Sequence, residues 1–296
     1  MASPVVQVEN FRMAFGAKTV IEDLSFQIDA AQTFGFLGSN GSGKTTTIRA
    51  LLGIYPPTAG RLLIAGRRFR PGDSKITLGY LPEERGLYKK ERVIDTMVYF
   101  GRLKGMSAKA AKSWSLAYLE RVGLPGKAKL RLDKCSGGEQ QKIQLGVTIM
   151  NDPELLILDE PTKGFDPVNR RLLLTLIGEQ RQRGCTILMV THQMEESERL
   201  CDRVLLLKDG VARAYGTVPQ VQEQFGGKSV KVVSERPLPT SPSYQILAAN
   251  GFETELKLNV SEREALAELA AAAVGMSQFT PVRRSLDSIF VEVYGS

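Results

Sequence analysis

The sequence is poor in cysteine, histidine and tryptophan, with only three, one and one of these among its 296 residues. The cysteines, Cys135, Cys185 and Cys201, form no Cys-x-x-Cys pair and are odd in number, which argues against a disulfide framework and favours free thiols in a reducing compartment. No apolar run approaches the roughly 20 residues that a membrane-spanning helix needs, and residues 1–4 do not begin a signal peptide. We therefore expect the chain to associate with a membrane only through a partner.

The charged residues give no sign of a nucleic-acid-binding surface. The net charge is +7, but acidic and basic residues are interspersed, and no basic cluster with interleaved aromatic residues is present. Such a cluster is typical of nucleic-acid binding, so we expect no nucleic-acid partner. Sustained heptads, which would indicate a coiled coil, are also absent. With 43% hydrophobic and 24% charged residues, the composition is that of a globular chain with one large domain or two.

The most informative stretch is residues 38–45, Gly-Ser-Asn-Gly-Ser-Gly-Lys-Thr, which has the phosphate-binding loop pattern Gly-x4-Gly-Lys-Ser/Thr. Glycines let the backbone wrap until its N–H groups point at a polyphosphate. Lys44 adds a positive charge for the β- and γ-phosphates, and the Thr45 hydroxyl is placed to ligate Mg²⁺. A buried-strand pattern at 33–37 and a helix pattern at 46–52 flank the loop, which makes a chance glycine-rich turn a poor alternative. The nucleotide-binding residues predicted here are Gly38, Ser39, Asn40, Gly41, Ser42, Gly43, Lys44, Thr45 and Thr46.

The surrounding chain alternates between strand and helix patterns. Strands are predicted at residues 5–9 and within 19–28, and a second strand pair is predicted near 61–66. Further strands are predicted at 76–81, 155–159, 185–190 and 203–208, the one at 203–208 being a last strand before the turn at Asp209 and Gly210. Helices are predicted at 93–104, 108–122, 138–150, 170–183 and 194–200. The closely spaced early strands favour an antiparallel layer, and the later alternation favours a parallel α/β core. Residues 86–150 are expected to form a helical subdomain, in which Ser107 caps a helix and Trp114 packs in the interior.

The composition shifts after about residue 217. Residues 236–242 are proline-rich, strand patterns occur at 230–233 and 253–260, and Ser261 to Glu264 form a capping box before an alanine-rich helix to about residue 274. A short terminal helix begins near Ser285. The fold class predicted is an α/β P-loop NTPase core with an antiparallel β layer and a helical subdomain, at 1–217, followed by a small α+β domain at 218–296.

Two adjacent carboxylates end the apolar run at 155–158. A continuous apolar run is typical of a strand buried on both faces of a parallel sheet. Phosphoryl chemistry needs one carboxylate to hold Mg²⁺ and one group to orient the attacking water. We assign Asp159 to the metal and Glu160 to the base, and the alternative is a solvated strand end.

Ser136-Gly137-Gly138-Glu139-Gln140-Gln141 then resembles the signature motif of the ATP-binding cassette (ABC) ATPases. Phosphate loop, signature, acidic strand end and downstream histidine follow in that family's order, and the resemblance covers roughly residues 5–217. The stretch 79–88, which includes Arg85, and the order of the tail are similar to the subgroup with sodium-efflux and drug-efflux ATPase subunits. The C-terminal part also resembles that subgroup's small C-terminal domain.

This resemblance implies roles for single residues. Phe15 matches the aromatic residue that stacks on adenine, although it could be a core aromatic. Ser136, Gly137 and Gly138 would open a helix whose amides face the γ-phosphate bound to a second copy. Asp166 matches the D-loop, which couples the two sites across the dimer. His192, although a lone histidine is more often structural, matches the switch residue at the γ-phosphate, so the catalytic set implied is Glu160, His192 and Lys44.

Four positions depart from the family pattern. Glu83 stands where a glutamine is usual; a carboxylate there can face Mg²⁺ but adds negative charge beside phosphates, and the metal ligands expected are Thr45, Asp159 and Glu83. Cys135 replaces the usual leucine before the signature, where a small thiol is tolerated. Glu139 replaces a frequent glutamine. Lys163 stands where a serine is common, and it either alters coupling across the dimer or has no effect.

The function expected is that of an ATP- and Mg²⁺-dependent ATPase subunit of an ABC transporter of the exporter type. Its partners would be a second copy, which forms an ATP-sandwich dimer, and a separately encoded membrane permease that docks on residues 86–105 and the Glu83 loop. It would then lie peripherally on the cytoplasmic face of the cell membrane. The alternatives are a soluble ABC ATPase that acts on nucleic acid or ribosomes, and a module that binds nucleotide without turnover.

Overall fold

The computed structural model describes residues 4–70, 72, 76–84, 86–225, 229–282 and 284–295. Two stretches used above fall partly beyond these residues. Residues 1–3, which were considered above for a signal peptide, and Arg85, which belongs to the stretch 79–88, lie outside the described residues.

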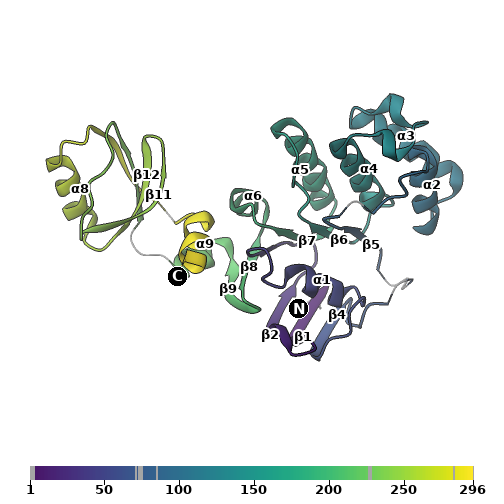
Figure 1. Ribbon diagram of the computed structural model, residues 1–296, viewed down its shortest axis with the longest axis horizontal. Helices are drawn as coiled ribbons and strands as arrows, with labels where there is room; N and C mark the ends of the chain where they lie inside the picture. Colours follow the sequence, from purple (N-terminus) through teal and green to yellow (C-terminus); the bar gives the residue numbers. More distant parts are fainter. Residues whose placement is uncertain are drawn as a thin grey trace.

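Within the described residues, the first sheet has nine strands in the order β4-β1-β2-β9-β8-β3-β7-β6-β5. Its antiparallel part comprises β1 (Val6–Phe15), β2 (Lys18–Ile28) and β4 (Ala59–Ile64). Its parallel part comprises β3 (Thr33–Leu37), β5 (Leu78–Leu81), β6 (Leu155–Asp159), β7 (Thr186–Thr191) and β8 (Arg203–Lys208). The predicted α/β core with an antiparallel layer is confirmed (Figure 1).

The helices around the parallel part are α1 (Lys44–Leu51), α4 (Gly137–Ile149), α5 (Pro167–Gln182) and α6 (Met194–Leu200). Two more, α2 (Val93–Leu103) and α3 (Ala108–Arg121), pack on each other and on α4. As predicted, Ser107 caps α3, because its hydroxyl accepts from the Ala110 N–H at 3.2 Å. Trp114 stacks on Tyr118, with the ring centres 5.1 Å apart, and packs against the core. Two short 3₁₀ turns, Pro125–Lys127 and Leu132–Lys134, connect α3 to α4.

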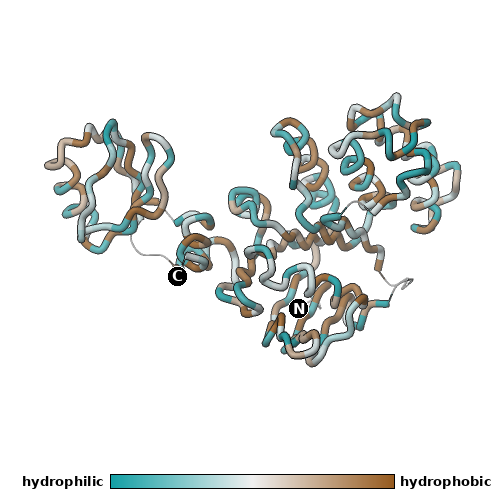
Figure 2. Tube along the Cα trace, in the orientation of Figure 1, coloured by the Kyte–Doolittle hydropathy of each residue, from teal (hydrophilic) through white to brown (hydrophobic). Residues whose placement is uncertain are grey.

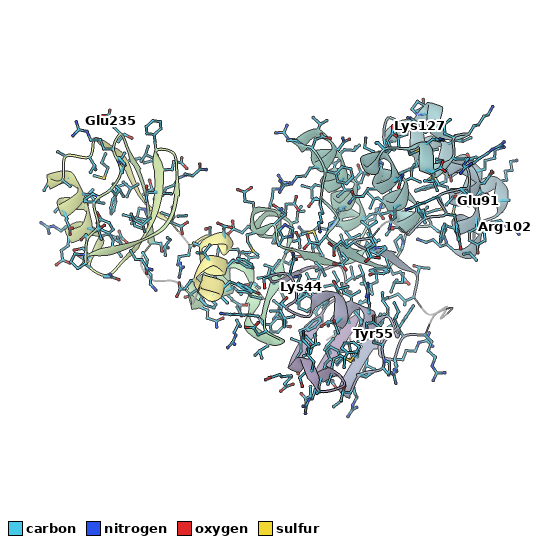
Figure 3. All side chains as sticks on the ribbon, in the orientation of Figure 1. Lys44, Tyr55, Glu91, Arg102, Lys127 and Glu235 are labelled. Atoms are coloured by element: carbon cyan, nitrogen blue, oxygen red, sulfur yellow. The ribbon has the colours of Figure 1, made fainter. Side chains whose placement is uncertain are left out.

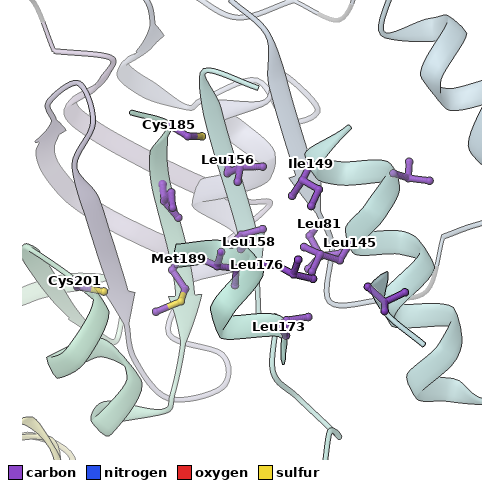
Figure 4. Close-up of a cluster of buried hydrophobic side chains, with 14 of the residues drawn as sticks. Leu81, Leu145, Ile149, Leu156, Leu158, Leu173, Leu176, Cys185, Met189 and Cys201 are labelled. Carbon is purple, nitrogen blue, oxygen red and sulfur yellow. The ribbon is translucent and has the colours of Figure 1, made fainter. Parts of the chain in front are cut away.

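Apolar strands at the centre of the sheet carry the core (Figure 2). Every residue of β3, β6 and β7 is buried, as the continuous apolar pattern predicted. Figure 4 shows how one face of these strands meets α4 and α5, with Leu156 and Leu158 facing Leu145 and Leu176. The three cysteines are buried and not bonded to one another, and burial raises the pKa of Cys201 to about 12.

Some predicted strands were wrong in number or extent. The predicted strand at 203–208 is present as β8, but the strand that follows the Asp209–Gly210 turn and pairs with it, β9 (Val211–Thr217), was not predicted. Its alanine and glycine residues have low strand propensity, and pairing with a neighbour overrides it. The early region holds the single strand β4 rather than a second pair.

The C-terminal part contains a separate four-stranded antiparallel sheet in the order β11-β12-β10-β13. Its strands are β10 (Ser229–Ser234), β11 (Tyr244–Asn250), β12 (Glu253–Leu258) and β13 (Met276–Val282), of which β11 and β13 were not predicted. The capping box at Ser261 is confirmed at the start of α8 (Glu262–Ala271). This sheet and α8 share a small core of their own.

Two further helices lie on one side of the predicted domain boundary in the sequence but pack on the other side of it in the structure. α7 (Val218–Gln224) and α9 (Leu286–Gly295) lie in the part assigned to the second domain. Their apolar residues Val221, Ile289 and Val293 nevertheless join the core of the first sheet. The boundary at residues 217/218 stays a prediction. Among the described residues, none of the helices combines the length and the apolarity needed to cross a bilayer.

Candidate nucleotide-binding site

The glycine-rich loop connects β3 to α1. Gly41 and Gly43 have φ angles of 82° and 109°, a region that favours glycine. A Cβ atom on Gly43 would lie 2.4 Å from Ile21 Cδ1, and one on Gly38 would lie 2.6 Å from the Leu207 carbonyl oxygen. The loop therefore needs glycine at these positions for both conformation and space.

Lys44 is folded over this loop. Its ammonium group is buried and donates to the carbonyl oxygens of Gly38 and Ser39, both at 2.8 Å. Burial lowers the pKa of Lys44, and the nearby carboxylates of Glu160 and Asp159 oppose that shift. Figure 3 labels Lys44 near the middle of the molecule. The amine is thus held beside the backbone that would surround a phosphate.

Asp159 and Thr45 meet at the end of β6. The Thr45 hydroxyl donates to Asp159 Oδ2 at 3.3 Å. The pKa of Asp159 is raised to about 6, mainly by burial; the hydrogen bond from Thr45 opposes this shift, and the carboxylates of Glu83 and Glu160 add to it. A buried carboxylate with this surrounding charge is a good partner for a cation.

Glu160 and His192 face each other because β6 and β7 are neighbouring parallel strands. Glu160 has a φ of 50°, and its N–H donates to the Val190 carbonyl at 2.8 Å, which fixes the turn after β6. The Glu160 carboxylate is buried and lies 2.9 Å from His192 Nδ1. This is a carboxylate–imidazole pair at the edge where the loop also lies.

Lys44, Thr45, Asp159 and Glu160 line one pocket of about 250 Å³, and His192 is not among its lining residues. Four separate stretches of chain contribute to it, and sequence reasoning missed Val20, which carries no chemical signal. The lining residues are Val20, Asn40, Gly41, Gly43, Lys44, Thr45, Thr46, Glu83, Asp159 and Glu160.

Glu83 is not alone in this pocket. Its Oε1 accepts from Lys163 Nζ at 2.6 Å, so two departures from the family pattern form an ion pair with each other. The pair raises the pKa of Lys163. The extra carboxylate beside the phosphate loop is therefore matched by an extra cation.

The other predicted nucleotide contacts do not line the pocket. Phe15 is 48% exposed and packs edge-on against Tyr55, with ring centres 5.4 Å apart. Ser136 caps α4 in a capping box with Glu139, whose carboxylate accepts from the Ser136 N–H at 2.8 Å. Asp166 caps α5 by accepting from the N–H groups of Val168 and Asn169. Gly137 and Gly138 form the first turn of α4.

Besides Asp159 and Glu160, a third buried acid, Glu196, was not predicted from the sequence. Glu196 of α6 accepts from the Thr162 hydroxyl at 3.0 Å and pairs with Arg170 of α5. It lies in an acidic helix start, Glu195-Glu196, which from sequence is typical of a solvated helix end. This network fixes the turn that follows Glu160.

The chemistry of the donor set fits a nucleotide with Mg²⁺. In the described ranges, no group of three or more His, Cys, Asp or Glu side chains could hold a metal alone. Mg²⁺ usually takes one or two protein oxygens and completes its shell with phosphate and water. Thr45 and Asp159 offer two such oxygens, and Ser42 Oγ of the loop is buried without a hydrogen-bond partner.

A glycine-rich loop between a buried strand and a helix, beside adjacent buried acids at the end of a parallel strand, defines a P-loop nucleotide-binding protein. The comparisons with known proteins narrow this class. The family model described as ABC transporter matches residues 21–163. The chain is 35% identical over 298 residues to the uncharacterised ABC transporter ATP-binding protein YhaQ of Bacillus subtilis, covering 99% of each.

Two relatives with more specific names are also similar. The linearmycin resistance ATP-binding protein LnrL of Bacillus subtilis is 31% identical over 306 residues, covering 98% of each chain. The Nod factor export ATP-binding protein I of Paraburkholderia xenovorans is 38% identical over 73% of this chain and 72% of its own. A solved ATP-binding subunit of an ABC transporter superposes with a TM-score of 0.69 at 29% identity, covering 75% of this chain and 93% of that one.

This chain belongs to the ABC transporter ATP-binding protein family. It is accordingly an ATPase and the ATP-binding subunit of an ABC transporter. Nothing in these comparisons favours action on nucleic acid.

Proposed function

We propose that two copies of this chain bind two ATP·Mg²⁺ between them and that hydrolysis powers an export-type membrane permease. The observation that carries the proposal is the convergence of Lys44, Asp159, Glu160 and Glu83 on one pocket from separate elements. Export is supported by relatives whose names refer to linearmycin resistance and Nod factor export.

Each pocket residue has a role that its position supports. Lys44 would exchange its two carbonyl partners for β- and γ-phosphate oxygens. Thr45 and Asp159, with Glu83 nearby, would hold Mg²⁺, which neutralises phosphate charge when bound. Glu160, placed 2.9 Å from His192 Nδ1, would orient the attacking water and take its proton, and His192 would approach the γ-phosphate.

In this proposal, the pocket of one chain lacks a group that would bind the outer side of the γ-phosphate. The first turn of α4, with Ser136, Gly137 and Gly138, is an anion-binding helix start that lies away from the pocket lining. A second copy would bring its own α4 start to the γ-phosphate, and Asp166 would lie at the contact between the two sites. Phe15, which is exposed at the end of β1, would stack on adenine.

The permease would dock on residues 86–105 and the Glu83 loop. This surface exposes Tyr88, Tyr99 and Leu103, which are 54%, 48% and 65% exposed. The rings of Tyr88 and Tyr99 lie 6.0 Å apart and form a small aromatic patch. Docking there would hold the chain, in which no described helix can cross a bilayer, peripherally at the cytoplasmic face of the membrane. The division into a nucleotide-binding domain at 1–217 and an accessory domain at 218–296 is part of this proposal.

The test is purification of the tagged chain from gently solubilised membranes. We expect a stoichiometric integral membrane protein to accompany the parent and to be lost from Tyr99→Ser, which keeps its ATPase activity in the isolated chain. A parent chain that purifies alone, or with RNA or ribosomes, would contradict the transporter assembly proposed here while leaving the ATPase chemistry intact.

A further inference from the structure

The last helix of the chain lies against both sheets. Leu286, Ile289 and Val293 of α9 are buried in the core of the first sheet. α9 also contacts β8 of that sheet and β11 of the second sheet (Figure 1). It is therefore a physical connection between the C-terminal sheet and the strands that carry the nucleotide site.

At the C-terminal end of α9, Tyr294 contacts the start of the phosphate loop. Its hydroxyl donates to the carbonyl oxygen of Leu207, the residue that also crowds Gly38. A Cβ atom on Gly38 would lie 3.1 Å from the Tyr294 hydroxyl oxygen. Burial raises the pKa of Tyr294, and hydrogen bonds from the backbone and side chain of Ser39 oppose that shift. Next to it, Lys208 Nζ donates to the Val293 carbonyl at 2.7 Å.

The residues that Tyr294 contacts are the ones that hold Lys44. The Lys44 ammonium donates to the carbonyl oxygens of Gly38 and Ser39. A shift of Gly38 or Ser39 would therefore move the partners of Lys44 and the first turn of the loop together. Tyr294 does not line the nucleotide pocket, so it can act only through these residues.

The other end of α9 is tied to the second sheet. The hydroxyls of Ser285 and Ser288 donate to the Glu255 carboxylate of β12 at 3.1 and 3.2 Å. Arg284, which is fully buried, donates to the Phe225 carbonyl at 2.8 Å and pairs with Glu292. The Leu286 N–H donates to Glu198 of α6. The helix is thus fixed at both ends.

We propose that Tyr294 is a positioning residue for the phosphate loop and that α9 makes ATP binding depend on the second sheet. The inference rests on the proposed nucleotide site. Preorganisation of the loop lowers the cost of binding, so loss of the Tyr294 hydroxyl should weaken ATP binding without slowing the chemical step.

The first test compares Tyr294→Phe with Tyr244→Phe in the full chain. Tyr244 is a matched control, because its hydroxyl also donates to a backbone carbonyl, that of Pro239 at 2.6 Å, but within the second sheet's core. With the non-hydrolysable analogue adenylyl imidodiphosphate and Mg²⁺, we expect Tyr294→Phe to raise Kd about threefold to tenfold, the effect of one hydrogen bond. KM for ATP should rise alike, with kcat within about twofold of the parent.

Each outcome separates the claims. If Tyr294→Phe binds the analogue like the parent, or if both tyrosine variants weaken it equally, the positioning role is overturned. Lys44→Ala distinguishes this from failure of the site itself. If the parent does not bind the analogue, or if Lys44→Ala binds it as well as the parent does, the proposed nucleotide site is wrong, and the positioning role of Tyr294 is wrong with it.

A double-mutant cycle tests the link to the second sheet. Glu255→Ala removes the acceptor that holds Ser285 and Ser288. We expect it to raise the analogue's Kd in the parent but not in the Tyr294→Phe background, because the connection is already broken there. Equal effects in both backgrounds, or none in the parent, would overturn the link.

Discussion

At the scale of single residues, the pairing of Glu83 with Lys163 explains two departures from the family pattern together. Each alone would disturb the site: Glu83 adds a negative charge to a pocket that already contains Asp159 and Glu160, and Lys163 adds a positive one. With Nζ and Oε1 2.6 Å apart, the two charges offset each other. The pocket therefore keeps a charge close to that of a site with neutral residues at both positions.

The prediction is that Lys163→Ser weakens nucleotide binding. Glu83 would lose its cation and repel the phosphates, which should raise the Kd for ATP about twofold to fivefold, a small effect because the pair is solvent-exposed. The measurement is ATP affinity at low and high salt, with the larger effect at low salt. Adding Glu83→Gln to Lys163→Ser should restore the parent affinity. Unchanged affinity in Lys163→Ser would show that the pair is only a surface contact.

The structure brings several of the predicted site residues together in one pocket, but the sequence did not reveal all of the contacts among them. Lys44, Thr45, Asp159 and Glu160 were predictable, because their chemistry depends on fixed spacing next to a strand end. The Glu83–Lys163 pair was not, since the two residues lie 80 positions apart and only folding brings them together. Tyr294 was missed for the same reason.

At the scale of elements, Lys104 joins two helices of the helical part. It follows α2, and its Nζ donates to the carbonyl of Thr148 at 2.6 Å and to that of Met150 at 3.4 Å, at the end of α4. Burial lowers the pKa of Lys104 to about 8. The helix ends are thus connected by an amine that is easier to deprotonate in the folded protein than in the unfolded one.

The predicted consequence is a pH-dependent stability. Because the folded pKa of Lys104 is about 8 and the ordinary value is 10.5, its contribution is complete above 10.5 and is lost as pH falls through 8. Relative to Lys104→Met, the parent should gain about 1–3 kcal/mol of unfolding free energy between pH 7 and pH 10. Urea unfolding at several pH values measures this. The exposed Lys112→Met is the control, and a parent–variant difference that does not vary with pH would contradict the prediction.

Elements with a local signal were predicted well, and those without one were not. Ser107 and Ser261 mark helix starts through their own side chains, and apolar runs mark β3, β6 and β7. By contrast, β9, β11 and β13 depend on pairing with β8, β12 and β10. Strand pairing of this kind is a property of the neighbour as much as of the segment.

At the scale of the whole molecule, the helix α9 contacts the region of the phosphate loop through Tyr294. The second sheet has its own core, but α7 and α9, on either side of it, pack into the first. The composition changes near residue 217, which led to the prediction of two separate domains at that point. The contacts of α9 with the first sheet could not be predicted, because they depend on packing between segments that are distant in the sequence. The arrangement makes the C-terminal part a structural neighbour of the phosphate loop.

The measurement that tests the central claim most directly compares the parent with Glu160→Gln. The amide keeps the shape of Glu160 but cannot take a proton from water, so ATP turnover should fall at least about a hundredfold. ATP binding should persist, and ATP with Mg²⁺ should convert the variant from monomer to a stable dimer by size-exclusion light scattering. Turnover equal to the parent's would show that Glu160 is not the base, and a variant that binds ATP but stays monomeric would contradict the shared site.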